Sequence, residues 1–292
     1  MKTLTQIISP IADELQQFEA YFGQTLKAET EPMDSIMRYV LDTRGKRLRP
    51  ILALLSAKLF GVINGQTLRA ATFVEMVHSA TLIHDDVVDN DDQRRGRASV
   101  KARFGNLSAV LAGDFLLAKA MLLLSHPDDH AILEVMLRTT AAMSEGELMQ
   151  GSVGLSYHGS RNDKNNGCRN DKNNGCHDGK NNGCHDVTAL QSQYLEIITN
   201  KTAMLMQSCC TAGALSVDAS TEQIRQIEDF GLNFGILFQL RDDMLDGENE
   251  EIAEALLPIY HEKALKALES FPPSEAKETL RNLTFFCFGR TE

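Results

Sequence analysis

Apolar residues recur at intervals of three and four positions through most of the chain, which is the spacing of one face of an α-helix. This pattern predicts helices over six stretches: Met33–Leu41, Leu68–Val88, Ala109–Leu124, Ala131–Met149, Tyr194–Leu215 and Ile224–Leu245. Alternating strand patterns are scarce. Several of the predicted helices are apolar nearly all round, which is typical of burial inside a thick helical assembly. The sequence therefore predicts an all-α fold.

One segment breaks the helical pattern. Residues 161–168 and 169–176 both read RNDKNNGC, and residues 177–184 read HDGKNNGC. This tandem octapeptide is rich in Asn, Gly and Asp and cannot bury an apolar face. We interpret residues 159–186 as a low-complexity, flexible insertion at the surface.

The alternative for this segment is a metal site built from its cysteines and histidines, namely Cys168, Cys176, Cys184, His177 and His185. Zinc ligands usually come in closely spaced CxxC-type pairs. A period of eight residues without such pairs favours repeat expansion in a tolerant loop.

The chain has 292 residues, of which 43% are apolar, and this is enough for a single large domain over residues 1–292. The net charge of −11 argues against a partner made of nucleic acid, because nucleic-acid-binding domains are usually basic. Residues 1–15 lack the apolar core of a secretory signal, and no uncharged run reaches the length that spans a bilayer. A cytoplasmic protein without a transmembrane segment is expected. Cys209 and Cys210 are interpreted as small buried hydrophobes.

The first candidate site lies where a long apolar helix ends in Asp85, Asp86 and Asp89. Three carboxylates at a helix C-terminus repel one another and face the negative end of the helix dipole. They suit a hard cation such as Mg²⁺, which takes oxygen ligands. The alternative is a solvated acidic helix end. Arg94 and Arg95 follow closely, and guanidinium forks beside carboxylates favour a metal-bridged diphosphate.

A second helix end repeats this arrangement. Asp242 and Asp246 are four residues apart, Asp243 lies beside them, and Gln239 precedes them on the same side. Gly247 is a natural helix stop. If the two helix ends face each other, six carboxylates line one cavity mouth. Without divalent metal, such a cluster would be strongly repulsive.

Further polar residues supply donors for an anion. Lys46 and Arg49 belong to the basic cluster GKRLRP before a predicted helix, and Lys201-Thr202 interrupts another apolar helix. His78 continues the Asp85 face, seven residues earlier. Each alone is typical of surface charge or, for the histidine, of a satisfied core residue. Together they provide the donors that a diphosphate needs.

In its ordered motifs the sequence resembles the trans-isoprenyl diphosphate synthases, especially the long-chain octaprenyl and heptaprenyl type. The motifs are GKRLRP, HSATLIHDDVVDNDDQRRGRAS, FGN, AGDF, EGELMQ, YLEIITNKTAML and FGLNFGILFQLRDDMLD. The resemblance implies a bundle of helices around a deep central cavity, usually as a homodimer. It also implies Mg²⁺-dependent condensation of an allylic diphosphate, such as farnesyl diphosphate, with isopentenyl diphosphate. The expected product is a long-chain all-trans polyprenyl diphosphate, which would partition into membranes.

The resemblance implies a role for each matching residue. The Mg²⁺ ligands would be Asp85, Asp86, Asp89, Asp242, Asp243 and Asp246. The residues on the allylic side would be Arg94, Lys201 and Gln239, with Thr202 near the leaving group. The isopentenyl diphosphate ligands would be Lys46, Arg49, His78 and Arg95.

Product length should depend on what lies beneath Asp85. Thr81 and Ala80 lie one turn below it, Val77 lies two turns below it, and none of the three is aromatic. A growing prenyl chain should therefore pass, which favours products longer than farnesyl diphosphate. We expect Ala80→Phe or Thr81→Phe to shorten the product.

The sequence departs from the family after Asp246. The family continues there with a Gly-Lys pair, a Gly-x-Asp, a further lysine and Thr-Leu-Pro, whereas this chain reads GENEEIAEALLPIYHEKALKALES. We interpret this as an apparent deletion after residue 246, which removes the lysine expected on the allylic diphosphate. The alternative function is therefore a catalytically weak or inactive homologue that supports an active synthase as a subunit.

Overall fold

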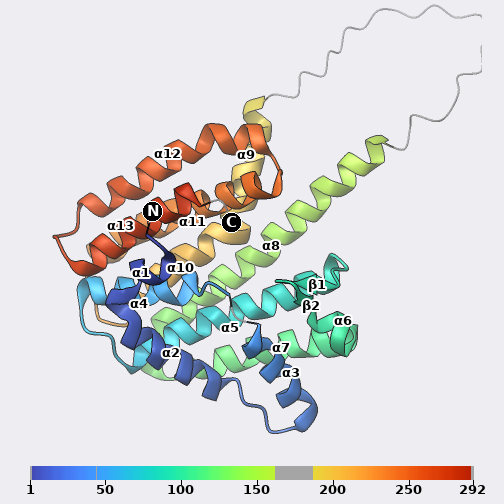
Figure 1. Ribbon diagram of the computed structural model, residues 1–292, viewed down its shortest axis with the longest axis horizontal. Helices are drawn as coiled ribbons and strands as arrows, with labels where there is room; N and C mark the ends of the chain where they lie inside the picture. The colour runs from blue at the N-terminus through green and yellow to red at the C-terminus, as the bar shows by residue number, and fades with distance from the viewer. Residues whose placement is uncertain (1, 44, 162–186, 291–292) are drawn as a thin grey trace, which may run out of the picture.

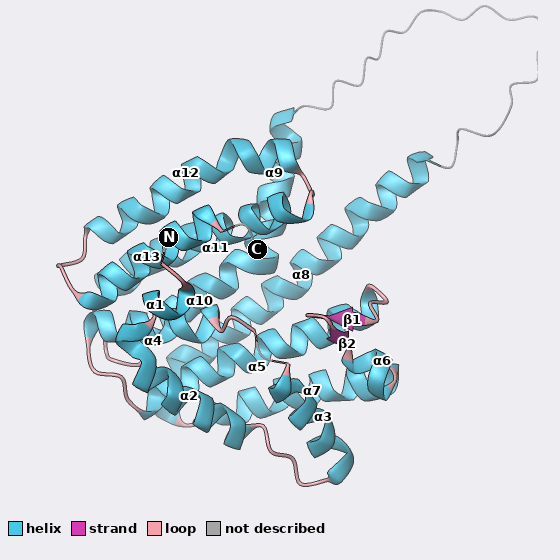
Figure 2. Ribbon diagram, in the orientation of Figure 1, coloured by secondary structure: helices cyan, strands magenta, loops and turns pink. Residues whose placement is uncertain are grey.

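The computed structural model of the chain describes residues 2–43, 45–161 and 187–290 (Figure 1). Helix fills nearly all of the described residues, and the one sheet among them is a short two-stranded hairpin (Figure 2). The predicted all-α fold class is confirmed.

The elements of the described N-terminal part are α1 (Leu4–Ile7), the 3₁₀ turn η1 (Ser9–Ile11), α2 (Ala12–Thr25), α3 (Glu31–Asp42), α4 (Leu48–Phe60), α5 (Gly65–Val88), β1 (Gln93–Arg94), β2 (Arg97–Ala98), α6 (Val100–Phe104), α7 (Asn106–Leu123), the 3₁₀ turn η2 (Pro127–Asp129) and α8 (His130–Arg161). Those of the C-terminal part are α9 (Val187–Ile198), the π-helical segment η4 (Thr199–Ala203), α10 (Met204–Leu215), α11 (Thr221–Asp246), α12 (Glu250–Glu269) and α13 (Glu275–Gly289).

All six predicted helical stretches are confirmed, but one of them is not continuous α-helix. The stretch predicted over Tyr194–Leu215 contains the π-helical segment Thr199–Ala203, which separates α9 from α10. A π turn holds one residue more than an α turn and is often found at functional sites. The helix predicted to follow the basic cluster begins at Leu48, so Arg49 and Pro50 lie in its first turn.

The helices pack around α10, which contacts α4, α8 and α11, while α12 lies along the outer side of α11 (Figure 1). The core between these helices is built from fully buried side chains such as Leu52 on α4, Phe73 on α5 and Phe230 on α11. Close packing of this kind gives the helix ends fixed positions relative to one another.

The two longest aspartate-bearing helices are capped at both ends. Asn64 begins α5 and Ser220 begins α11, each with a side chain that accepts from the third backbone N–H and closes a capping box. Gly247 ends α11 in the left-handed conformation, with φ of 71°, as predicted. Asp89 caps α5, so both helices stop at their aspartate clusters.

Some predictions concern residues that the structure does not describe. The predicted insertion, residues 159–186, lies outside the described residues from 162 onward, as do the cysteines and histidines of the alternative metal site. Cys209 and Cys210 are buried and free, which confirms their interpretation as small hydrophobes.

Helix α7 requires a closer look because the sequence analysis expects no membrane-spanning segment. Among the described residues it is the one helix whose length and composition suit a membrane crossing. Of its 18 residues, 28% are buried in the fold. Leu107, Leu111 and Leu122 on this helix are exposed, with relative accessibilities of 75%, 50% and 71%. An apolar face of this kind marks an interaction surface.

Candidate active site between two aspartate-bearing helix ends

The first helix end carries two aspartates in different environments. Asp86 is buried and accepts hydrogen bonds from Arg94 Nε and Nη2, at 2.7 and 2.5 Å. Asp85 is partly buried, and its pKa is raised to about 6 by burial and by the nearby carboxylates of Glu147 and Asp89. The charged form of Asp85 is therefore under-compensated, whereas Asp86 has a protein cation of its own.

At the second helix end, Asp243 is held by two donors. Tyr194 donates its phenolic proton to one carboxylate oxygen, and Gln239 Nε2 donates to the other at 2.7 Å. Gln239 in turn accepts from Thr202 Oγ1 at 2.8 Å. Burial raises the pKa of Asp243, although both donors lower it. The network fixes three of the predicted residues in one chain of hydrogen bonds.

Asp242 is paired with Arg290, which follows α13. The Arg290 guanidinium donates to Asp242 Oδ1 at 2.5 Å and to the Phe238 carbonyl at 3.2 Å, and it lies 4.3 Å from the centroid of the Phe238 ring. Arg241 Nε donates to the Arg290 carbonyl at 2.7 Å. This contact brings a segment 48 residues further along the chain onto the second helix end.

Lys201 contacts α8. Its ammonium group donates to Gln150 at 2.9 Å and forms an ion pair of 2.8 Å with Glu147 on α8. The same positive charge partly offsets the rise in the pKa of Asp85 on α5 and of Asp243 on α11, which burial causes. That the two helix ends face one site stays a prediction.

The basic side of the site is formed by Arg49 and His78. Arg49 Nη1 lies 2.9 Å from His78 Nε2, and burial together with the positive charge of Arg49 holds the pKa of His78 well below its usual value. His78 is therefore neutral. Arg49 Nε is buried and has no hydrogen-bond partner among the described residues. A buried donor of this kind is costly unless an anion satisfies it.

Arg95 is placed by the turn of the β1–β2 hairpin. Arg95 and Gly96 both have positive φ, 53° and 72°, which is the signature of a two-residue type I′ turn. The turn carries Arg95 back over α3, where its Nη1 donates to the Thr43 carbonyl at 3.1 Å. Left-handed backbone is unusual for arginine, so the contacts of its side chain help to hold it there.

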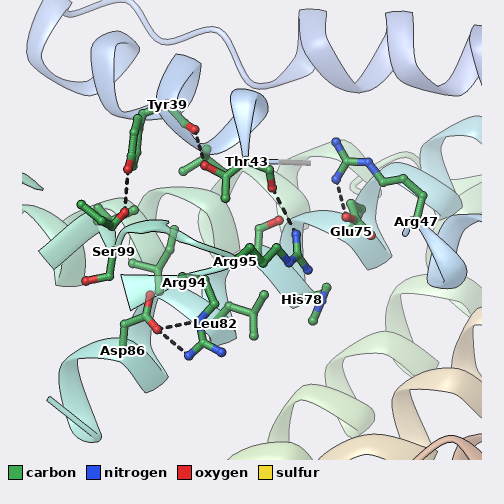
Figure 3. Close-up of a pocket in the computed structure, with 15 residues that line it drawn as sticks. Tyr39, Thr43, Arg47, Glu75, His78, Leu82, Asp86, Arg94, Arg95 and Ser99 are labelled. Atoms are coloured by element: carbon green, nitrogen blue, oxygen red, sulfur yellow. Dashed lines mark hydrogen bonds and ion pairs between the residues drawn. The ribbon is translucent and has the colours of Figure 1, made fainter. Parts of the chain in front are cut away.

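Figure 3 shows a pocket between α3, α5 and the hairpin. It is lined by Glu75, Ser79 and Asp86, which form one face of α5, and by Arg94 and Arg95. The second helix end does not line this pocket. Among the described residues, the site is thus divided between this pocket and the Asp85 face of α5, rather than forming the single cavity mouth expected from the sequence.

The residues predicted to control product length lie inside α5. Val77 and Ala80 are fully buried, and Thr81 is partly buried with its hydroxyl donating to the His78 carbonyl at 3.0 Å. Asp89 and Asp246 are exposed, as is Lys46. Their roles stay predictions.

A divalent cation fits this site. Within the described residues, no three acidic, histidine or cysteine side chains are close enough to hold a metal ion by themselves. Mg²⁺, however, commonly binds through one or two carboxylates together with substrate phosphates rather than in an all-protein cage. Burial raises the pKa of Asp85, and a bound cation would lower it. The sequence analysis expected six carboxylates at one cavity mouth to repel one another strongly without divalent metal, but Asp86 and Asp242 pair with arginines and Asp243 accepts from Gln239.

Sequence reasoning missed several residues of this site. Glu147 lies in the EGELMQ motif, whose residues were given no role, and Tyr194 begins the YLEIITNKT motif. The partners of Arg290 and Arg47 could not be predicted from nearby residues, because each arginine meets its carboxylate only through the fold.

Comparison with known proteins identifies the family. A family model described as Polyprenyl synthetase matches residues 30–254. The chain belongs to the polyprenyl synthetase family. It is 31% identical over 267 residues to the octaprenyl diphosphate synthase of Haemophilus influenzae, which covers 87% of this chain and 72% of that protein. It is 30% identical over 249 residues to the geranylgeranyl diphosphate synthase of Methanosarcina mazei, with coverage of 83% and 68%.

Solved structures support the fold of this polyprenyl synthetase. The crystal structure of a polyprenyl synthase from Caulobacter crescentus CB15, complexed with calcium and isoprenyl diphosphate, matches with a TM-score of 0.81 at 24% identity. The match covers 99% of this chain and 98% of that chain. The resemblance seen in the motifs is thus confirmed for the family, which is one of prenyltransferases, and for its all-α fold.

The raised pKa of Asp85 predicts how the stability of the metal-free synthetase varies with pH. Between the ordinary value of 3.8 and about 6, the folded chain keeps a proton on Asp85 that the unfolded chain has released. This contribution to the free energy of unfolding should therefore fall as the pH rises through that window. Urea unfolding of the wild type and of Asp85→Asn, with chelator present, measures the effect. A difference between the two proteins that does not change with pH would contradict it.

Proposed function

We propose that this polyprenyl synthetase is a Mg²⁺-dependent prenyltransferase that condenses an allylic diphosphate, such as farnesyl diphosphate, with isopentenyl diphosphate. The product would be a long-chain all-trans polyprenyl diphosphate. The observation that supports this proposal best is the pairing of carboxylates with arginines at both helix ends, Asp86 with Arg94 and Asp242 with Arg290. Carboxylates beside guanidinium groups are suited to a metal-bridged diphosphate.

The metal would be held by the two aspartate clusters, that is by Asp85, Asp86, Asp89, Asp242, Asp243 and Asp246. When bound, Mg²⁺ supplies charge neutralisation for the departing pyrophosphate. Burial raises the pKa of Asp85 and a bound cation would offset this cost, so we assign Asp85 a leading role in holding the metal. Both hydrogen bonds from Arg94 go to Asp86 Oδ1, which keeps that carboxylate oriented.

The chain's own donors would hold the two substrates. Lys201 and the Thr202–Gln239 pair lie beside Asp243 and would bind the allylic diphosphate, with Arg94 on the opposite helix end. Arg49 would bind isopentenyl diphosphate with its unsatisfied Nε, beside Lys46, Arg95 and His78. Neutral His78 can donate a hydrogen bond without adding charge. Such an arrangement would place the double bond of isopentenyl diphosphate near the carbon of the allylic diphosphate that ionises. This placement is its main advantage for the reaction rate.

The direct test is a product assay. Purified protein is incubated with Mg²⁺, farnesyl diphosphate and labelled isopentenyl diphosphate, and the extracted products are separated by chain length. Labelled prenyl chains that depend on Mg²⁺ are expected. The proposal would be overturned if the chain alone made no product but stimulated a co-expressed synthase. The chain would then be a supporting subunit of that synthase.

We propose that product length is set beneath Asp85. Val77 and Ala80 are small and buried, and Thr81 bonds back to its own helix, so none of them projects a bulky side chain. Ala80→Phe should therefore shorten the product distribution, which chromatography of the extracted chains measures. An unchanged distribution from an active variant would show that the prenyl chain does not run past this turn.

We propose that the synthetase forms a homodimer through α7. Leu107, Leu111 and Leu122 are exposed on one side of this helix, and a second copy of the same side would cover them. Light scattering should show a dimer for the wild type and a monomer for Leu111→Glu. Ile259→Glu, at an exposed position on α12, is the matched control and should remain dimeric. A dimeric Leu111→Glu protein would place the interface elsewhere.

A further inference from the structure

Arg47 lies between two predicted substrate residues, Lys46 and Arg49, but its side chain faces away from them. Its Nε donates to Glu19 on α2 at 2.9 Å, and its Nη1 donates to Glu75 on α5 at 2.5 Å. The Arg47 side chain is only 8% exposed and that of Glu75 only 4%. Arg47 thus joins the segment before α4 to two other helices, and Figure 3 shows its contact with Glu75.

Arg49 is anchored to the same helix as Arg47. It reaches His78 on α5, one turn after Glu75. Since Lys46, Arg47 and Arg49 come from one short segment, the contacts that hold Arg47 on α2 and α5 also fix where the side chains of Lys46 and Arg49 begin.

The backbone of Arg47 is in the left-handed region, with φ of 55°. L-residues other than glycine, asparagine and aspartate rarely adopt this conformation, and it persists only where surrounding contacts enforce it. The two carboxylates provide that enforcement. Burial lowers the pKa of the Arg47 guanidinium, but Glu75 and Glu19 outweigh it and raise the pKa, so the guanidinium stays charged.

A buried ion pair of this kind is a poor way to gain stability. Apolar side chains of similar volume would often be at least as stable, because both charges must be taken out of water. Glu75 lies one turn before His78 on the same helix, so the pair ties the basic segment to the helix that carries the predicted anion ligand. Its geometry is better explained by positioning than by stability.

A second contact holds the same segment from the opposite side. The Arg95 guanidinium lies so close to Gly45 that a Cβ added there would be 2.5 Å from Arg95 Nη1. Arg95 also bonds the Thr43 carbonyl. Thr43, Gly45 and Arg47 are therefore each held by contacts with the hairpin or with Glu75.

We infer that Arg47 is a positioning residue, which together with Glu75 and Glu19 orients Lys46 and Arg49 for binding isopentenyl diphosphate. This inference rests on the proposed function, and it adds to it three residues whose charged groups are engaged with one another. Because Arg47 acts on only one of the two substrates, its loss should affect that substrate selectively.

The variants are Glu75→Gln, which keeps the shape and removes the charge, and Arg47→Met. Both should raise KM for isopentenyl diphosphate by about 10- to 100-fold, the usual effect of displacing binding groups by about 1 Å, with little change in kcat or in KM for the allylic diphosphate. Arg47→Lys should restore part of the loss. The matched control is Glu14→Gln, which breaks the 2.8 Å pair with Lys58 that also joins α2 to α4. The control should leave both KM values unchanged.

Calorimetry with isopentenyl diphosphate alone, on the full chain, separates this inference from the proposed reaction. A wild type that binds it but makes no product would refute the proposed activity, and weaker binding by Glu75→Gln would still uphold the role of Arg47. Unchanged binding by both variants would overturn the inference. So would equal losses in kcat, both KM values and thermal stability, which would indicate a merely structural role. If Arg47→Met does not fold, Glu75→Gln and Arg47→Lys decide.

Discussion

Replacing Asp85 by asparagine is expected to lower kcat/KM for prenyl product formation by roughly a thousandfold. Asparagine keeps the shape of the side chain but removes one carboxylate charge at the first helix end, where burial raises the pKa of Asp85. The loss should appear in kcat as well as in KM, because charge builds on the pyrophosphate as the allylic bond breaks. Steady-state assays with labelled isopentenyl diphosphate measure it.

The control for this prediction is Asp92→Asn. Asp92 belongs to the same acidic stretch, but its side chain is 81% exposed and its partner is Lys101, at 3.3 Å. The control should lose little activity and little stability. An Asp85→Asn protein as active as this control would refute the assignment of the first helix end as part of the site.

The second large effect is expected on stability, at the crossing of α4 and α10. A Cβ added to Gly213 would lie 2.1 Å from the Ala53 carbonyl oxygen, which belongs to the rigid backbone of the other helix. Gly213→Ala should force the helices apart and lower the free energy of unfolding by about 3 kcal/mol, despite the better helix propensity of alanine. Urea unfolding followed by circular dichroism measures the change.

Gly23→Ala is the matched control, since it lies within α2 and a Cβ there would meet nothing within 4 Å. This substitution should raise stability by about 0.5–1 kcal/mol, through helix propensity alone. Equal stability of the Gly213→Ala and Gly23→Ala variants would show that α4 and α10 lie further apart than they do in the structure.

The helices of this fold could be predicted from sequence because their apolar spacing is strong and local. Asp85 with Asp86, and Asp242 with Asp243, were also visible as candidates, since each pair ends such a helix. The partners of these aspartates were not visible. Arg290 meets Asp242 across 48 residues, and no spacing along the chain predicts such a contact.

The Arg47–Glu75 pair shows a further limit of sequence reasoning. Arg47 belongs to a basic cluster, and the cluster was interpreted as a set of anion donors facing one way. The left-handed backbone at Arg47 turns its side chain toward α2 and α5 instead. Sequence spacing cannot show this reversal, because the carboxylates that stabilise it come from elements 28 residues away on either side.

The π-helical segment explains which residues meet α11. In a regular α-helix, residues eight apart differ by about 80° around the axis, whereas residues seven apart nearly coincide. That spacing would align Tyr194 with Lys201. The extra residue in Thr199–Ala203 instead aligns Tyr194 with Thr202, and both contact the Gln239–Asp243 pair, while Lys201 turns to Glu147.

It follows that the winding of this helix decides which side chain reaches α11. If Thr199–Ala203 relaxed into ordinary α turns with every residue kept, Lys201 would take the place of Thr202 on the side of Tyr194. A cation would then stand where a hydroxyl now donates to Gln239, with no change in any of the side chains.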